Sequence, residues 1–378
     1  MKKAIAALLA FILLFSTALP AFAFPSDEDG AEDETYGIAK GYVRTKEIYK
    51  RNDGHTQVIT STYNKQGRLV KKTETSKSDD WVYKTVIKNT YDKKGQLTKH
   101  VESFNNSVIT ISYTYDKKGN EIKQVNHTDY WNGDSETETT VSTYNEKNML
   151  TREKLYLDDG VATTTYRYNN KGALMKMKTK TIMDDNRQGT DSITHSYDKA
   201  GNTIKTVSTT QEFDGSVQKW VYVRTYNKKN LCTKEVEDHF LKDSNGESDK
   251  ARIIRTYTYD KHGNVATEKT LVSYSGKTMR EQSSVNTYDK KNNLIRQVNR
   301  QKDSDGTSKV IISYTYNVNN LLTRYTAVSK NEGENYKVTE TYTYDDAGNL
   351  TKYVLNSRCA DGIQEKETRT YTYQKIGA

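Results

Sequence analysis

The chain of 378 residues has little of the material from which an ordinary globular core is built, since 34% of its residues are hydrophobic and 28% are charged. Its two prolines, Pro20 and Pro25, stand near the N-terminus, so no proline interrupts hydrogen bonding in any later strand. Its two cysteines, Cys232 and Cys359, allow a disulfide but exclude a disulfide framework. Low hydrophobicity favours disorder, but 29 tyrosines, often alternating with threonine, favour β-strands.

Long apolar runs are also missing, except at the N-terminus, where two lysines precede residues 4–19 and Ala21-Phe22-Ala23 follows. Small residues at this spacing predict a signal peptide over residues 1–23, cleaved after Ala23, and a secreted protein in the periplasm or the extracellular medium. An uncleaved anchor is the alternative, for which the run is slightly short. We expect residues 24–40 to form an acidic flexible leader and residues 41–378 to form one repeat domain, with no membrane span after signal removal.

A short polar phrase, Thr-Tyr-Asp-Lys-Lys-Gly-Asn at 114–120, returns with small changes every 24 to 33 residues. We call its tyrosine the marker tyrosine. The twelve marker tyrosines are Tyr63, Tyr91, Tyr115, Tyr144, Tyr168, Tyr197, Tyr226, Tyr259, Tyr288, Tyr316, Tyr344 and Tyr373. A near-constant period of this length indicates a repeat architecture.

The residues that follow the marker tyrosine predict a hairpin turn, which we call the marker turn. The next residue is Asp or Asn in eleven of the twelve copies, and the residue four positions after the tyrosine is always Gly or Asn. Asp or Asn caps the first corner of a type I turn, and Gly or Asn enters the left-handed region most readily. Ahead of the turn, alternation such as Ile111, Tyr113 and Tyr115 predicts a half-buried strand.

A second set of turns, which we call the variable turns, separates successive marker turns at Asn-Gly or Asp-Gly pairs such as Asn132-Gly133 and Asp214-Gly215. Strand and turn therefore alternate, and half-units stand at both ends. This pattern predicts an all-β fold: a long antiparallel meander of repeated β-hairpins with about 24 strands, in a curved or spiral sheet. A six-bladed propeller is the alternative, because 24 strands divide into four-stranded blades. Uncapped edges would favour edge-to-edge self-association.

The motif resembles the YD repeat of the bacterial Rhs family. Tyr113, Tyr115, Asp116 and Gly119 fall on that family's Y-x-Y-D-x-x-G pattern, and a second match is Tyr342, Tyr344, Asp345 and Gly348. The resemblance implies a β-sheet that coils into a spiral or hollow shell, which encloses a cargo domain in large toxins and decorates cell surfaces in other members. This chain is short for the family, has a longer repeat period and ends on a repeat. These differences argue against a self-contained toxin.

The sequence predicts no catalytic, cofactor or metal site, and we expect no enzyme activity. Asp and Asn interchange within the marker turns, which suits a turn cap and not a general acid or base. The six histidines show no pair at metal-ligand spacing. Aromatic residues in or beside the variable segments are the candidate ligand-binding residues, because flat rings beside polar groups suit sugar recognition; they are Trp81, Tyr130, Trp131 and Trp220.

These observations favour a non-catalytic secreted scaffold or adhesin that binds envelope glycans or a partner protein multivalently. The alternative function is an Rhs-like shell that encloses or chaperones a separately encoded cargo. The formal net charge of +9 favours anionic partners such as cell-wall polymers, although dispersed lysines can equally serve solubility. We expect cell-wall polysaccharide or another extracellular protein as partner and no nucleic acid, because no nucleic-acid-binding motif accompanies the charge.

Overall fold

The computed structural model describes residues 38–78, 81–304, 306–330, 335–359, 362 and 364–376. These residues form strands and turns and contain no helix. The strands in chain order are β1(Tyr42–Arg51), β2(Thr56–Tyr63), β3(Leu69–Lys77), β4(Val82–Tyr91), β5(Leu97–Ser103), β6(Ser107–Tyr115), β7(Glu121–Tyr130), β8(Ser135–Tyr144), β9(Leu150–Leu157), β10(Gly160–Tyr168), β11(Leu174–Met183), β12(Gln188–Tyr197), β13(Thr203–Gln211), β14(Val217–Tyr226), β15(Cys232–Lys242), β16(Ser248–Tyr259), β17(Val265–Tyr274), β18(Lys277–Tyr288), β19(Leu294–Asp303), β20(Gly306–Tyr316), β21(Leu322–Lys330), β22(Asn335–Tyr344), β23(Leu350–Arg358) and β24(Gln364–Lys375).

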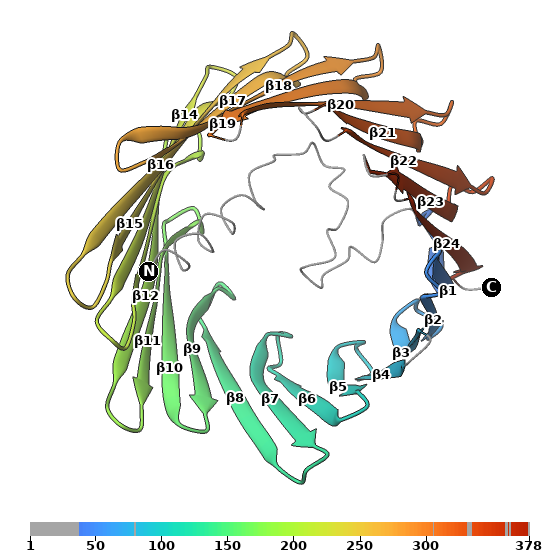
Figure 1. Cartoon of the computed structure of the whole chain (residues 1–378). Coiled ribbons are helices and arrows are strands. Elements are labelled where there is room, and N and C mark those ends of the chain that lie inside the picture. The colour runs from blue at the N-terminus through green and yellow to red at the C-terminus, as the bar shows by residue number, and fades with distance from the viewer. Residues whose placement is uncertain are drawn as a thin grey trace.

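All 24 strands belong to one antiparallel sheet that closes into a barrel (Figure 1). Each strand pairs with the next strand along the chain, and β24 pairs with β1. The predicted antiparallel meander of about 24 strands is therefore confirmed. The sheet forms neither an open spiral nor separate blades, because repeated hairpins of one twist add a similar rotation until the last strand meets the first. The two edges that the sequence left open thus pair with each other.

The seam between β1 and β24 reproduces the geometry of the other hairpins. Every marker hairpin shows a register shift at its marker tyrosine, as between Thr114 and Tyr115, which pairs with Glu121. At the seam, Tyr373 pairs with Arg44, and the register shifts there in the same way. The half-unit at each end of the domain therefore supplies one strand of a twelfth bulged pair, whose two strands come from opposite ends of the chain.

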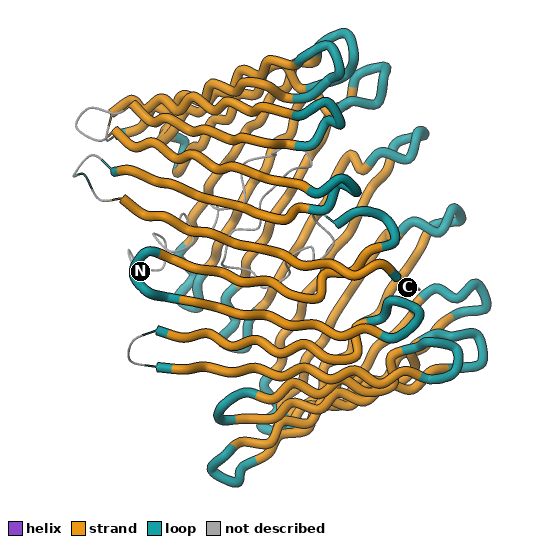
Figure 2. Tube along the Cα trace, turned by 90° about the vertical axis from the view of Figure 1, so that its right-hand side faces the viewer, coloured by secondary structure: helices purple, strands orange, loops and turns teal. Residues whose placement is uncertain are grey.

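The marker turns lie at one end of the barrel and the variable turns at the other (Figure 2). In the turn at Asp116, the Gly119 N–H donates to the Asp116 carbonyl at 3.1 Å, and the Asp116 N–H donates to the Asn120 carbonyl at 2.9 Å. The joint residues of eleven marker turns have positive φ, and Gly377 of the twelfth lies outside the described residues. These joints are Gly67, Gly95, Gly119, Asn148, Gly172, Gly201, Asn230, Gly263, Asn292, Asn320 and Gly348.

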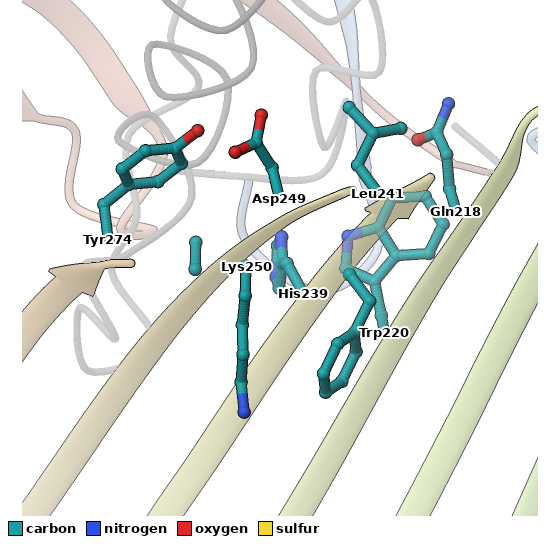
Figure 3. A pocket seen from close by; sticks show the side chains of 9 residues that line it. Gln218, Trp220, His239, Leu241, Asp249, Lys250 and Tyr274 are labelled. Carbon is teal, nitrogen blue, oxygen red and sulfur yellow. The ribbon is translucent and has the colours of Figure 1, made fainter. Parts of the chain in front are cut away.

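The two faces of the wall differ sharply in burial. One face carries the marker tyrosines and the residues that pair with them, and we call it the inner face. Tyr274, Asp249 and Leu241 belong to this face. In Figure 3 they extend toward the opposite wall of the barrel, whereas Lys250 extends away from it. Side chains converge on the concave side of a closed sheet and diverge on the convex side. The buried strand side chains are accordingly on the inner face, with Val298 as the exception: Glu47, Ser76, Thr85, Glu237, His239, Ile253, Thr270, Val272, Leu294, Gln297, Ile312, Leu322, Ala327, Ser329, Glu340, Tyr342 and Leu350.

Candidate functional site

The inner face is held together at the marker-turn end by a repeated tyrosine hydrogen bond. Each marker tyrosine hydroxyl donates to a carbonyl on the preceding strand, at 2.5 to 3.0 Å. The pairs are Tyr63–Arg44, Tyr91–Leu69, Tyr115–Leu97, Tyr144–Glu121, Tyr168–Leu150, Tyr197–Leu174, Tyr226–Thr203, Tyr259–Cys232, Tyr288–Val265, Tyr316–Leu294, Tyr344–Leu322 and Tyr373–Leu350. The backbone pairing between β5 and β6 ends at Lys99 and Ser112. The Tyr115 hydroxyl therefore donates to a carbonyl, that of Leu97, which lies beyond the paired residues.

The Asp or Asn of each marker turn acts as a turn cap in the same way whichever residue is present. Asp116 Oδ1 accepts the backbone N–H groups of Lys118 and Asn120 at 2.8 and 2.9 Å. In the next marker turn, Asn145 Oδ1 accepts the corresponding N–H groups of Lys147 and Met149 at 2.9 and 3.0 Å. The backbone N–H groups recognise only an acceptor oxygen, which explains why the sequence interchanges Asp and Asn here.

Acidic and basic side chains separate between the two faces of the wall. Most carboxylates of the strands are on the inner face: Glu47, Glu74, Glu102, Glu121, Glu136, Glu138, Glu153, Asp191, Glu235, Glu237, Asp249, Glu268, Asp303, Glu340, Glu365 and Glu367. Most lysines and arginines of the strands are on the outer face, which carries only Asp129, Asp238 and Glu281 as acids. Acids therefore predominate on the inner face, which gives that face a negative potential.

An ion-pair network occupies the inner face of β15 and β16. Arg255 Nη1 lies 2.8 Å from a carboxylate oxygen of both Glu235 and Glu237, and His239 Nε2 lies 2.6 Å from the second oxygen of Glu237. Burial alone would raise the pKa of Glu237, but the hydrogen bonds from His239 and Arg255 and the charge of Arg255 lower that pKa to about 2. The carboxylate is thus held ionised inside the wall.

A recess of about 30 Å³ lies on the inner face beside this network (Figure 3). Trp220 and His239 line it with their ring centroids 5.8 Å apart, edge to face, and Asp249 and Tyr274 lie across it. His239 is 8% exposed, and its Nδ1 makes no hydrogen bond. The recess has the volume of roughly one water molecule, so it is a local feature of the inner wall and too small to hold a sugar by itself.

The four predicted ligand-binding residues do not form one site. Trp220 lines the recess on the inner face of β14. Tyr130 ends β7 and Trp131 stands in the turn after it with 83% of its surface exposed, whereas Trp81 precedes β4 and contacts His55 at a centroid distance of 5.7 Å. Trp81 and Trp131 therefore sit on separate hairpins at the variable-turn end of the barrel.

The ion-pair network beside Trp220 was not predicted from the sequence. Glu235, Glu237 and His239 occupy alternate positions of β15, so they share the face that carries Trp220. Their alternation in the sequence indicated a shared face, but the pairing with Arg255 could be recognised only from the strand register.

Cys232 and Cys359 are both free thiols. The described residues contain no metal-binding group of three or more His, Cys, Asp or Glu, and no described helix is long and apolar enough to cross a membrane.

Comparison with known proteins leaves the family unassigned. No protein-family model matches the chain, and no curated protein is similar to it in sequence. The crystal structure of TcdB2-TccC3 is 12% identical over 82% of this chain, with a TM-score of 0.29, and this chain spans 21% of that structure's chain. A porin-like protein from Bacteroides uniformis ATCC 8492 is 16% identical over 63% of this chain and 97% of its own, with a TM-score of 0.28. Neither likeness is close enough to place this chain in a family.

Proposed function

We propose that this protein is a non-catalytic, secreted shell whose barrel encloses a basic segment of another polypeptide. The pairing of β1 with β24 carries this proposal, because it turns the repeated meander into a closed wall. Barrels of 16 to 22 strands already leave a lumen that their own side chains do not fill, and this barrel has 24 strands. A rigid wall with a wide lumen is the geometry of a container.

The charge of the inner face indicates the chemistry of the contents. On β3 to β8, the carboxylates of Glu74, Glu121, Glu136 and Glu138 face inward, and no described lysine or arginine forms an ion pair with them. On β15 and β16, by contrast, Arg255 neutralises its neighbours within the wall. Inward-facing carboxylates without a basic partner raise the local concentration of cations and favour a basic polypeptide over an acidic one.

A fluorescent oligo-arginine peptide provides the test, with an oligo-glutamate peptide of the same length as its charge-reversed counterpart. We expect the basic peptide to bind with saturable stoichiometry and the quadruple variant Glu74→Gln, Glu121→Gln, Glu136→Gln and Glu138→Gln to bind it more weakly. A matched control neutralises acids on the outer face, Asp129→Asn and Glu281→Gln. Equal binding of both peptides, or equal loss in both variants, would refute a cation-selective lumen.

The adhesin hypothesis from the sequence is the second candidate, and the exposed rings of Trp81 and Trp131 at the variable-turn end favour it. Its mechanism is a set of weak ring contacts with envelope glycans, summed over several hairpins. A glycan array with the wild-type protein and the Trp81→Ala, Trp131→Ala double variant tests it. We expect binding that the double variant loses; an array without signal, or with the same signal for both proteins, contradicts this candidate.

A further inference from the structure

A group of six cations on the outer face lies on β9, β10 and β11, and we call it the outer basic patch. It consists of Arg152, Lys154, Arg167, Lys176, Lys178 and Lys180. The register places Thr165 between Arg152 and Lys178, and Thr163 between Lys154 and Lys180. The cations therefore stand in rows across the strands, with successive rows about 6.8 Å apart because each row is two residues further along.

The patch carries no neutralising charge. The outward positions of β8 to β14 contain no Asp or Glu. None of the six cations forms an ion pair or a side-chain hydrogen bond with a described carboxylate, and all but Lys154 are exposed. Elsewhere on the same face Arg252 is held by Asp238 through two hydrogen bonds of 2.6 and 2.9 Å. The patch thus differs from an ordinary mixed surface.

This arrangement has a cost that an anionic partner would relieve. Arg167 stands directly opposite Lys176 on the neighbouring strand, and like charges at directly opposed positions destabilise a sheet. An anion between the rows would remove this repulsion and would also find the hydroxyl group of Thr163 as a hydrogen-bond donor.

An apolar row borders the cations on the side of the variable turns. Val161 pairs with Tyr156 on one side and Ile182 on the other, and Tyr156 and Ile182 are 41% and 40% exposed. The ammonium of Lys154 lies 6.0 Å from the centre of the Tyr156 ring. An exposed ring beside cations can pack against a sugar or polyol unit while the cations bind its charged groups.

We propose that the outer basic patch binds a linear phosphodiester polymer with sugar or polyol units, as found in anionic cell-envelope polymers. Rows of cations that repeat along the strand direction suit an extended chain with regularly spaced phosphates. The patch offers one exposed ring on a convex wall, whereas proteins that bind single-stranded nucleic acid combine a groove with several stacking rings. The proposal concerns the outside of the wall and is independent of what the lumen holds.

Binding of fluorescent poly(glycerol phosphate) chains of defined length tests the proposal. The variant Lys176→Gln, Lys178→Gln, Lys180→Gln removes three cations of the patch. The control Lys71→Gln, Lys84→Gln, Lys88→Gln removes the same charge from the outer face of β3 and β4. We expect the patch variant to bind at least about tenfold more weakly and to lower the slope of log affinity against log salt by about 2 to 3. The control should stay within about twofold of the wild type, because it leaves the patch intact.

Chemical footprinting of lysines on the wild-type protein is a second test, and it requires no variant. Acetylation of lysines with and without the polymer should show protection of Lys176, Lys178 and Lys180 and little protection of Lys71, Lys84 and Lys88. The proposal is overturned by equal loss of binding in the two variants or by protection spread evenly around the wall. It is also overturned if duplex DNA, single-stranded nucleic acid or anionic vesicles bind at the patch and poly(glycerol phosphate) does not.

Discussion

The two faces of the barrel wall perform different tasks, and strand β16 shows the contrast within four residues. Arg255 points inward, is 11% exposed at its side chain and neutralises Glu235 and Glu237. Arg252 points outward, is 45% exposed and pairs with Asp238 in contact with water. Ile253 is buried on the inner face, and Ile254 is half-buried on the outer face. The comparison indicates that the inner face stabilises the barrel, whereas the outer face is free to contact other molecules.

The largest difference is expected between the two arginines of β16. Arg255→Ala leaves the buried carboxylate of Glu237 without its arginine, whereas Glu235 keeps its ion pair with Arg224, and the loss should lower the free energy of unfolding by about 3–5 kcal/mol. Arg252→Ala breaks an exposed pair and should cost at most about 1 kcal/mol. Urea unfolding followed by circular dichroism measures both. Equal costs for the two variants would show that the faces do not differ in this way.

The adjacent residues Ile253 and Ile254 compare the two faces by the packing of apolar side chains and not by charge. Ile253→Ala creates a cavity in the inner face and should cost about 2–5 kcal/mol. Ile254→Ala removes the same atoms from a half-buried site, so we expect less than half of that loss. The same unfolding measurement applies. A larger effect at Ile254 would place the principal packing of this strand on the outer face.

Acid should affect the inner network selectively, because the pKa of Glu237 is lowered to about 2. An acid whose pKa is depressed by folding contributes stability that is complete above its unfolded pKa of 4.5 and is lost as the pH falls toward about 2. Unfolding free energies between pH 6 and pH 2 should therefore fall more steeply for the wild type than for Glu237→Gln. Parallel pH profiles for the two proteins would contradict the ionised, paired state of Glu237.

The smallest effect is expected at the marker tyrosine hydroxyls. Tyr288→Phe removes the hydrogen bond to the Val265 carbonyl and should cost about 0.5–1.5 kcal/mol. The outward neighbour Thr287 is exposed, and Thr287→Val should change stability by at most about 0.5 kcal/mol. Thermal unfolding of both variants measures the difference. No loss in Tyr288→Phe would show that the Val265 carbonyl needs no second donor beside Asn286 Nδ2, which donates to it at 2.9 Å.

The local elements of this fold were predictable from the sequence, and the closure was not. The Asp or Asn cap, the left-handed joint and the alternating tyrosines each depend on a few neighbouring residues, so the turn at Asp116 to Gly119 could be predicted directly. The pairing of Tyr373 with Arg44 depends on twist summed over 24 strands, to which no single residue points. The network of Glu235, Glu237 and Arg255 depends on cross-strand register and was missed for the same reason.

Closure of the sheet is the central claim, and the distance between β1 and β24 tests it most directly. Lys50 pairs with Thr368 across the seam on the outer face. Nitroxide labels on Lys50→Cys and Thr368→Cys, with Cys232 and Cys359 replaced by serine, would report this distance by electron paramagnetic resonance. We predict strong dipolar broadening between the two labels within one molecule. Spectra equal to the sum of the two singly labelled proteins would contradict closure and indicate an open sheet.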